Sequence, residues 1–347
     1  MSDRGVGHYT ESHIGNGKAG RVSLPNTVEE KSTIGAVPLQ EAGYEALQRY
    51  LRRLRKSLAI LEAADDADAI HDARVAVREL RAVAAFLEPS PCFNGKWLHQ
   101  LDKGLRHLAQ TLGTVRDTDV FLEHLESYVA QHEAAGEQLA WLQHALRLRR
   151  KKATRQVHKA LENAKTRQLL KRTQRRLERL QHTASADRTA TKPAKTSGSG
   201  QSYPLLLRHF AGSAIWGRYQ EILSYEMALP EAGAETLHKL RIACKRLRYS
   251  IQIFGLTPAA LLETVAALKA AQDELGQLHD VFYADQLTRE LWQASSPGTE
   301  VANRSYQEFL DSLLGEGQQL RASIGPLWQR LTGLPMRQAI AGFIAAL

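Results

Sequence analysis

The chain has 347 residues, 43% of them hydrophobic and 24% charged, which is ordinary usage for a globular protein of about two domains. Its two cysteines lie in different segments, which excludes a disulfide scaffold and a cysteine-rich zinc module. The sequence has no run of about 20 apolar residues that could span a membrane, and the polar first 33 residues lack the apolar core of a signal peptide. We therefore expect a cytoplasmic protein.

In chain order, residues 1–37 are rich in Gly, Ser, Asn and Thr without an apolar period, which predicts a disordered tail. Helical periodicity predicts a first half over 38–182 and a second half over 203–347. The Thr-, Lys- and Ser-rich stretch 183–202 between them predicts a flexible linker. The predicted helices span residues 39–62, 69–87, 96–113, 117–131, 136–181, 204–229, 234–254, 258–276, 280–294, 303–320 and 327–347. Because no segment alternates like a strand, we predict an all-α fold of antiparallel helical bundles.

The net charge of +9 is concentrated in one part of the chain. Residues 147–179 contain fourteen Lys and Arg against two acids, Glu162 and Glu178, while the rest of the chain is slightly acidic. A basic stripe of this kind indicates a polyanionic partner, because uncompensated charges repel one another. The alternative is a solvated helix without a partner.

An internal repeat is the most informative feature of the sequence. Four positions recur at a constant offset of 167 residues: His71, Arg74, Arg78 and Arg81 correspond to His238, Arg241, Lys245 and Arg248. A second motif recurs at an offset of 163, where Gly113 and Asp117 correspond to Gly276 and Asp280. The repeat predicts two similar helical halves joined by the linker.

Each copy of the first motif predicts a cationic helix face. An α-helix turns about 100° per residue, so the four side chains of one copy fall within about 80° of its surface, apart from the apolar face. Like charges at this spacing destabilise a helix, but they could bind successive phosphates of a linear polymer, with Arg making forked contacts. The alternative for each arginine is a salt bridge to an acidic helix, and for each histidine an N-cap or a core hydrogen bond.

The second motif has a structural interpretation. We expect Gly113 and Gly276 to end helices, and Asp117 and Asp280 to cap the helices that follow. Arg116 and His279 lie in the predicted connections and could add cationic contacts. No catalytic signature is present, and neither motif has the spacing of a metal site. We therefore predict binding without catalysis, and expect no cofactor and no metal.

Together these residues resemble the CHAD family, the conserved histidine α-helical domain. The resemblance covers residues 44–347 and is carried by His71 to Arg81, Leu112 to Val120, His238 to Tyr249 and Leu275 to Asp280. It implies two helical bundles related by a pseudo-two-fold axis with a basic surface between or across them, binding of inorganic polyphosphate, and association with polyphosphate granules in some members. We expect the cationic helix faces to line a groove or pore on that surface. The resemblance places the site at His71, Arg74, Arg78, Arg81, His238, Arg241, Lys245 and Arg248, and we extend it to Arg116, Arg150, Lys151 and Arg155.

Two other functions remain open. A basic stripe alone would also suit a nucleic-acid-binding protein, although no helix-turn-helix, zinc-finger or aromatic stacking signature is present. An enzyme acting on phosphorylated substrates is the third hypothesis. The segment before residue 38 is too short for the CYTH triphosphatase domain often fused to CHAD domains, so we do not expect that activity. For polyphosphate binding we expect tighter association at pH 6 than at pH 8, through protonation of His71 and His238.

Overall fold

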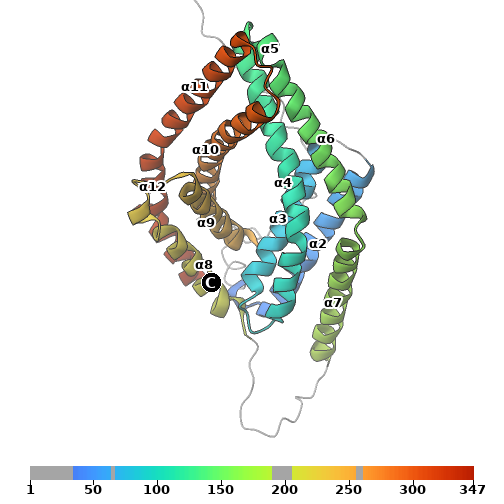
Figure 1. Cartoon of the computed structure of the whole chain (residues 1–347). Coiled ribbons are helices and arrows are strands. Elements are labelled where there is room, and N and C mark those ends of the chain that lie inside the picture. The colour runs from blue at the N-terminus through green and yellow to red at the C-terminus, as the bar shows by residue number, and fades with distance from the viewer. Residues whose placement is uncertain (1–33, 64–66, 190–204, 255–260) are drawn as a thin grey trace, which may run out of the picture.

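The computed structural model describes residues 34–63, 67–189, 205–254 and 261–347, which form helices and connections (Figure 1). In the first half the helices are η1 (Ile34–Ala36), α2 (Leu39–Ala63), α3 (Ala67–Leu87), α4 (Gly95–Gln131), α5 (Ala135–Gln138), α6 (Ala140–Glu162) and α7 (Ala164–Thr189). In the second half they are α8 (Leu207–Leu223), η2 (Glu226–Ala228), α9 (Ala234–Gln252), α10 (Leu262–Ser295), α11 (Glu300–Ala322), α12 (Ile324–Thr332) and α13 (Leu334–Ala346). The described part of the chain has no strand, so the all-α prediction is confirmed.

The helices bury the apolar stripes that their sequences predict. In α2, Leu47, Leu51, Leu54 and Leu61 recur at spacings of three, four and seven residues and are almost fully buried. Asn94 begins α4 as an N-cap, because its side-chain oxygen accepts a hydrogen bond from the Trp97 amide at 2.9 Å. None of the described helices is both long and apolar enough to cross a membrane.

The predicted helix ends at Gly113 and Gly276 are wrong. Helix α4 continues through Gly113 and Asp117, and α10 continues through Gly276 and Asp280. The two aspartates are therefore mid-helix residues and not N-caps. Neither glycine has the positive φ of a helix-ending residue, since Gly298 is the one glycine with that conformation in the described part of the chain.

The predicted helix over residues 136–181 is divided into three. Asn163 adopts an extended backbone (φ −60°, ψ 122°), and its side chain accepts a hydrogen bond from the Lys165 amide at 2.8 Å. This residue therefore separates α6 from α7, so the basic segment 147–179 is not one helix. Helix α7 then runs to Thr189, inside the stretch predicted as a linker. The remainder of that stretch lies outside the described residues.

The first described residues lie inside the stretch predicted as a tail. Residues 34–36 form η1, and the carbonyl of Val37 accepts a hydrogen bond from the Leu207 amide at 2.8 Å. An isolated antiparallel bridge joins Pro38 to Leu206. Backbone hydrogen bonds therefore join the start of the first half to the start of the second. Residues 1–33 lie outside the described part.

Two hydrophobic cores hold the helices together, and each draws residues from both halves of the sequence. The larger joins α2, α3 and the first part of α4 to α8, α9 and the first part of α10. The smaller joins the second parts of α4 and α10 to α5, α6 and α11, with Phe121 and Phe309 stacked at 6.3 Å between ring centroids. The two halves therefore share their apolar interior, while their pseudo-two-fold relation remains a prediction.

Candidate anion-binding site

Helices α3 and α9 carry the two copies of the first motif, and they pack against each other (Figure 1). A side-chain hydrogen bond joins them, because Nη2 of Arg78 on α3 donates to the hydroxyl of Tyr249 on α9 at 2.9 Å. Around this bond, the predicted cationic face of α3 and that of α9 lie next to each other. The sequence left open whether they form one site or two, and the structure brings them together.

We call the five residues that meet there the cationic cluster: Arg74 and Arg78 from α3, with Arg241, Lys245 and Arg248 from α9. All five side chains are half-buried. Burial, and to a lesser extent repulsion from the other four members of the cluster, lowers the pKa of Lys245 to about 6. Lys245 therefore loses its proton more easily in the ligand-free protein than an ordinary lysine does.

Two histidines border the cluster. The rings of His238 and His279 lie 4.6 Å apart between centroids. Burial is the main cause of the low pKa of both imidazoles, and nearby positive charges add to it, so that the pKa of His279 falls to about 4. The expected protonation of His238 near pH 6.5 is therefore disfavoured in the free protein, because its neighbours Arg241 and Lys245 oppose it.

Two carboxylates also face the cluster. Oδ1 of Asp117 on α4 lies 3.4 Å from Nη2 of Arg74, and Asp280 on α10 interacts most strongly with Arg241. Burial raises the pKa of both carboxyl groups, although the surrounding cations lower it in part. The second motif thus supplies the site with negative charges, a role that the capping interpretation missed.

Gly276 gives Arg241 its position. Nε of Arg241 donates to the carbonyl of Gln272 at 3.4 Å, and a Cβ on Gly276 would lie 3.2 Å from Nη2 of the same guanidinium. The guanidinium therefore lies close to the backbone of α10, and a side chain at residue 276 would displace it by a few tenths of an ångström. Gly113, the equivalent residue on α4, has no such neighbour: its Cβ would come no closer than 3.9 Å to Oδ2 of Asp117.

Several polar atoms at the site are buried without a hydrogen-bond partner among the described residues. The donors are Nε of Arg78 and Nε of Arg248, and Nδ1 of His238, a donor or an acceptor according to its tautomer, is a third buried polar atom without a partner there. Buried polar atoms in native proteins are almost always hydrogen-bonded, so each of these atoms requires an explanation. An anion between α3 and α9 would give the two guanidinium groups an acceptor.

Three predicted site residues belong to ion pairs and do not join the cluster, as the salt-bridge alternative expected. Arg81 donates to Asp102 at 2.8 Å, and this pair joins α3 to α4. The other two pairs are Arg116 with Glu123 at 2.9 Å and Arg150 with Asp119 at 2.6 Å.

The remaining predicted residues are exposed. His71 lies 3.4 Å from its neighbour Asp72, and both side chains are more than half exposed. Lys151 and Arg155 are exposed on α6 and form no ion pair within the described part of the chain. The structure therefore brings together Arg74, Arg78, His238, Arg241, Lys245 and Arg248, six of the twelve predicted residues.

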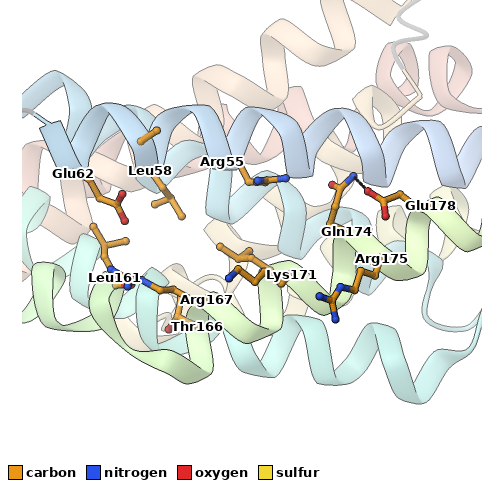
Figure 2. Close-up of a pocket in the computed structure, with 12 residues that line it drawn as sticks. Arg55, Leu58, Glu62, Leu161, Thr166, Arg167, Lys171, Gln174, Arg175 and Glu178 are labelled. Atoms are coloured by element: carbon orange, nitrogen blue, oxygen red, sulfur yellow. Dashed lines mark hydrogen bonds between the residues drawn. The ribbon is translucent and has the colours of Figure 1, made fainter.

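A separate groove of about 440 Å³ lies between α2 and α7 (Figure 2). Arg55, Lys171 and Arg175 line it, together with Glu62 and Glu178. No member of the cationic cluster is among its lining residues. Its lining contains no residue of either repeated motif, so we do not assign the anion site to it.

Five contributors to the site were not among the predicted site residues: Tyr249, Gln272, Asp117, Asp280 and His279. Tyr249 follows the last cationic residue of the second copy, so its place in the motif was the available signal. The contribution of Gln272 could not be predicted from the sequence, because it is a backbone carbonyl, which every residue has. Among the described residues, no group of three or more His, Cys, Asp or Glu side chains could hold a metal ion.

Comparison with known proteins defines the class. The model of the CHAD domain family matches residues 45–289, more than half of the chain, and this protein belongs to that family. Its structure is similar to the crystal structure of the CHAD domain from the plant Ricinus communis, with a TM-score of 0.66 and 22% identity over 86% of this chain and 93% of that one. It is also similar to PptA from Streptomyces chartreusis, with a TM-score of 0.62 and 14% identity over 84% of this chain and 99% of that one. No curated protein matches the chain. At these identities the two likenesses show the fold alone.

Proposed function

We propose that this protein binds inorganic polyphosphate in the cationic cluster and catalyses no reaction on it. The observation that carries the proposal is the convergence of five half-buried cationic side chains from α3 and α9 on one place. Their mutual repulsion costs stability in the free protein, and a bound polyanion relieves it. Membership of the CHAD family agrees with this choice of ligand.

The burial of the cluster favours a thin anion over a wide one. The side chain of Arg74 is only 20% exposed. A single phosphate chain has charged oxygens along its whole length and can enter between two helices, whereas the phosphates of a duplex lie on a much wider cylinder. Each arginine can present two parallel N–H groups to a phosphate, and Lys245 adds a point charge.

Binding is expected to depend steeply on salt, because the polymer releases its counterions as the cluster neutralises it. We propose that the protein acts in the cytoplasm and associates there with polyphosphate granules. Release of phosphate from the polymer in the presence of magnesium would contradict the proposal that no reaction occurs.

A second candidate function is the binding of nucleic acid by the exposed cations of α6 and α7. Lys151, Lys152, Arg155 and Lys159 on α6 are exposed and form no ion pair with the described residues. Such a surface binds any polyanion through its charge alone.

Two variants with equal loss of charge distinguish these surfaces. The cluster variant combines Arg74→Gln, Arg78→Gln, Arg241→Gln and Arg248→Gln. The control variant combines Lys151→Gln, Lys152→Gln, Arg155→Gln and Lys159→Gln. We expect the cluster variant to lose affinity for polyphosphate by about 100-fold or more, with its helical circular dichroism retained, and the control variant to change little. Equal losses in both would mean that the protein is a general polyanion surface.

A further inference from the structure

Two carboxylates occupy equivalent places in the cationic cluster. Asp117 on α4 and Asp280 on α10 are the corresponding residues of the second repeat motif. Among the positive charges around each carboxylate, the strongest effect comes from an arginine of the same half, Arg74 for Asp117 and Arg241 for Asp280. In each half of the chain, therefore, one aspartate interacts with an arginine of the same half.

The contacts of these acids are partial. The 3.4 Å separation between Oδ1 of Asp117 and Nη2 of Arg74 is long for a charge-assisted hydrogen bond. Arg241 lies over Gly276, one helical turn before Asp280, and donates from Nε to the backbone instead. Neither arginine is closed into a bidentate pair, so both keep donors for another anion.

The same carboxylates have opposite effects on the empty and the occupied site. In the free protein they reduce the repulsion among the arginines and Lys245. When a phosphate binds to Arg74 or Arg241, a carboxylate a few ångströms away repels it. At such distances one unit charge changes an interaction enough to alter a binding constant about tenfold.

We infer that Asp117 and Asp280 are internal counter-anions. They stabilise the empty cluster, and they lower its affinity for a bound phosphate chain so that the chain is released. The inference rests on the proposed function of the cluster. It assigns the two acids a role in setting affinity, beyond packing.

The test is substitution by the isosteric amide. Asp117→Asn and Asp280→Asn each remove a charge and keep the shape of the side chain. We expect each variant to bind long-chain polyphosphate about tenfold more tightly, mainly through slower dissociation, and to unfold at a lower temperature without ligand. A purely structural role predicts that affinity and thermal stability fall together.

Glu221→Gln is the matched control. Glu221 on α8 accepts from Nη1 of Arg246 on α9 at 2.6 Å, and Arg246 is exposed and not part of the cluster. The control should unfold at a slightly lower temperature and bind polyphosphate as the wild type does. A rise in its affinity similar to that of the Asn variants would reduce the effect to net charge and overturn the inference.

A second background keeps the test informative if the single variants fold poorly. The double variant Arg74→Gln with Asp117→Asn removes both charges of the pair. We compare the gain in affinity that Asp117→Asn gives in two backgrounds, and expect it to be smaller in the Arg74→Gln background than in the wild type. If the wild type itself fails to bind polyphosphate, the proposed function fails. If the wild type binds and the Asn variants bind equally or more weakly, this inference alone is wrong.

Discussion

The hydroxyl of Tyr249 accepts a hydrogen bond from Nη2 of Arg78 at 2.9 Å, and this bond joins the two halves of the chain at their cationic faces. It fixes one guanidinium of α3 against α9. Because Nε of Arg78 has no acceptor among the described residues, that guanidinium is held in place but not fully satisfied. Nε of Arg78 is therefore available to donate a hydrogen bond to a ligand.

Tyr249→Phe should loosen this arrangement. The substitution removes the acceptor and leaves the ring that lies 5.2 Å from the guanidinium carbon of Arg248. We expect the free energy of unfolding to fall by about 1 kcal/mol and polyphosphate affinity to fall severalfold, because Arg78 is no longer positioned. Chemical denaturation and a binding titration check the two effects. Unchanged affinity would show that Arg78 does not take part in binding.

Lys245 should make polyphosphate binding depend on pH. Its pKa is about 6 in the free protein, and a bound polyanion raises that pKa toward the ordinary value. Binding therefore takes up a proton between about pH 6 and the pKa of the complex, and affinity falls as pH rises through that window. Titration calorimetry in buffers of different ionisation heat measures the uptake. No proton uptake at pH 7.5 would contradict this assignment.

Lys245→Met should remove that dependence and change stability with a defined sign. The pKa of Lys245 is lower in the folded than in the unfolded protein, so the unfolded state binds the proton more tightly. The contribution of Lys245 to the free energy of unfolding therefore rises with pH from about 6 toward 10.5. The methionine variant should be more stable than the wild type at pH 5, bind polyphosphate more weakly, and take up fewer protons. Denaturation at several pH values tests the sign.

Gly276→Ala should weaken binding, whereas Gly113→Ala should not. A Cβ at residue 276 would lie 3.2 Å from Nη2 of Arg241, so the guanidinium has to move, while the Cβ at residue 113 finds no atom closer than 3.9 Å. Both variants gain up to about 1 kcal/mol of helix propensity. We expect both to keep their stability or exceed it, and only Gly276→Ala to lose affinity severalfold. Equal affinities would show that the position of Arg241 does not matter.

Arg81→Gln and Arg150→Gln should affect stability and not binding. Each removes one partner of a half-buried ion pair, with Asp102 and Asp119 respectively. We expect each substitution to lower the free energy of unfolding by about 1–2 kcal/mol, because the remaining carboxylate loses its partner. A loss of polyphosphate affinity comparable to that of Arg74→Gln would show that these residues do belong to the binding site.

The sequence predicts the helices better than it predicts the details of the site, and it leaves open whether the cationic faces of α3 and α9 meet. Periodicity places α2 and α3 within two residues, since a buried apolar stripe is a strong signal. It misplaces helix ends at Gly113 and Gly276, because a glycine inside a helix resembles one that ends it. The real reason for Gly276 is the approach of Arg241, a contact between residues 35 positions apart.

The charge pattern identifies candidates but cannot separate ligands from ion pairs. Arg78 and Arg81 occupy neighbouring turns of the same helix face, yet one meets Tyr249 and the other Asp102. The difference depends on which helix packs on each side of α3, which the sequence does not state. For the same reason the histidine interpretation changes: burial, together with the neighbouring Arg241, lowers the pKa of His238, and Lys245 becomes the group that titrates in the expected range.

The most direct test of the account is a competition between two polyanions. Labelled long-chain polyphosphate is bound to the wild-type protein, and unlabelled polyphosphate or duplex DNA is added at equal phosphate concentration and at two salt concentrations, one of them about 0.15 M. The account predicts that polyphosphate binds tightly and that DNA displaces it poorly at both. Equal displacement by DNA per phosphate would contradict it and assign binding to the exposed cations of α6 and α7.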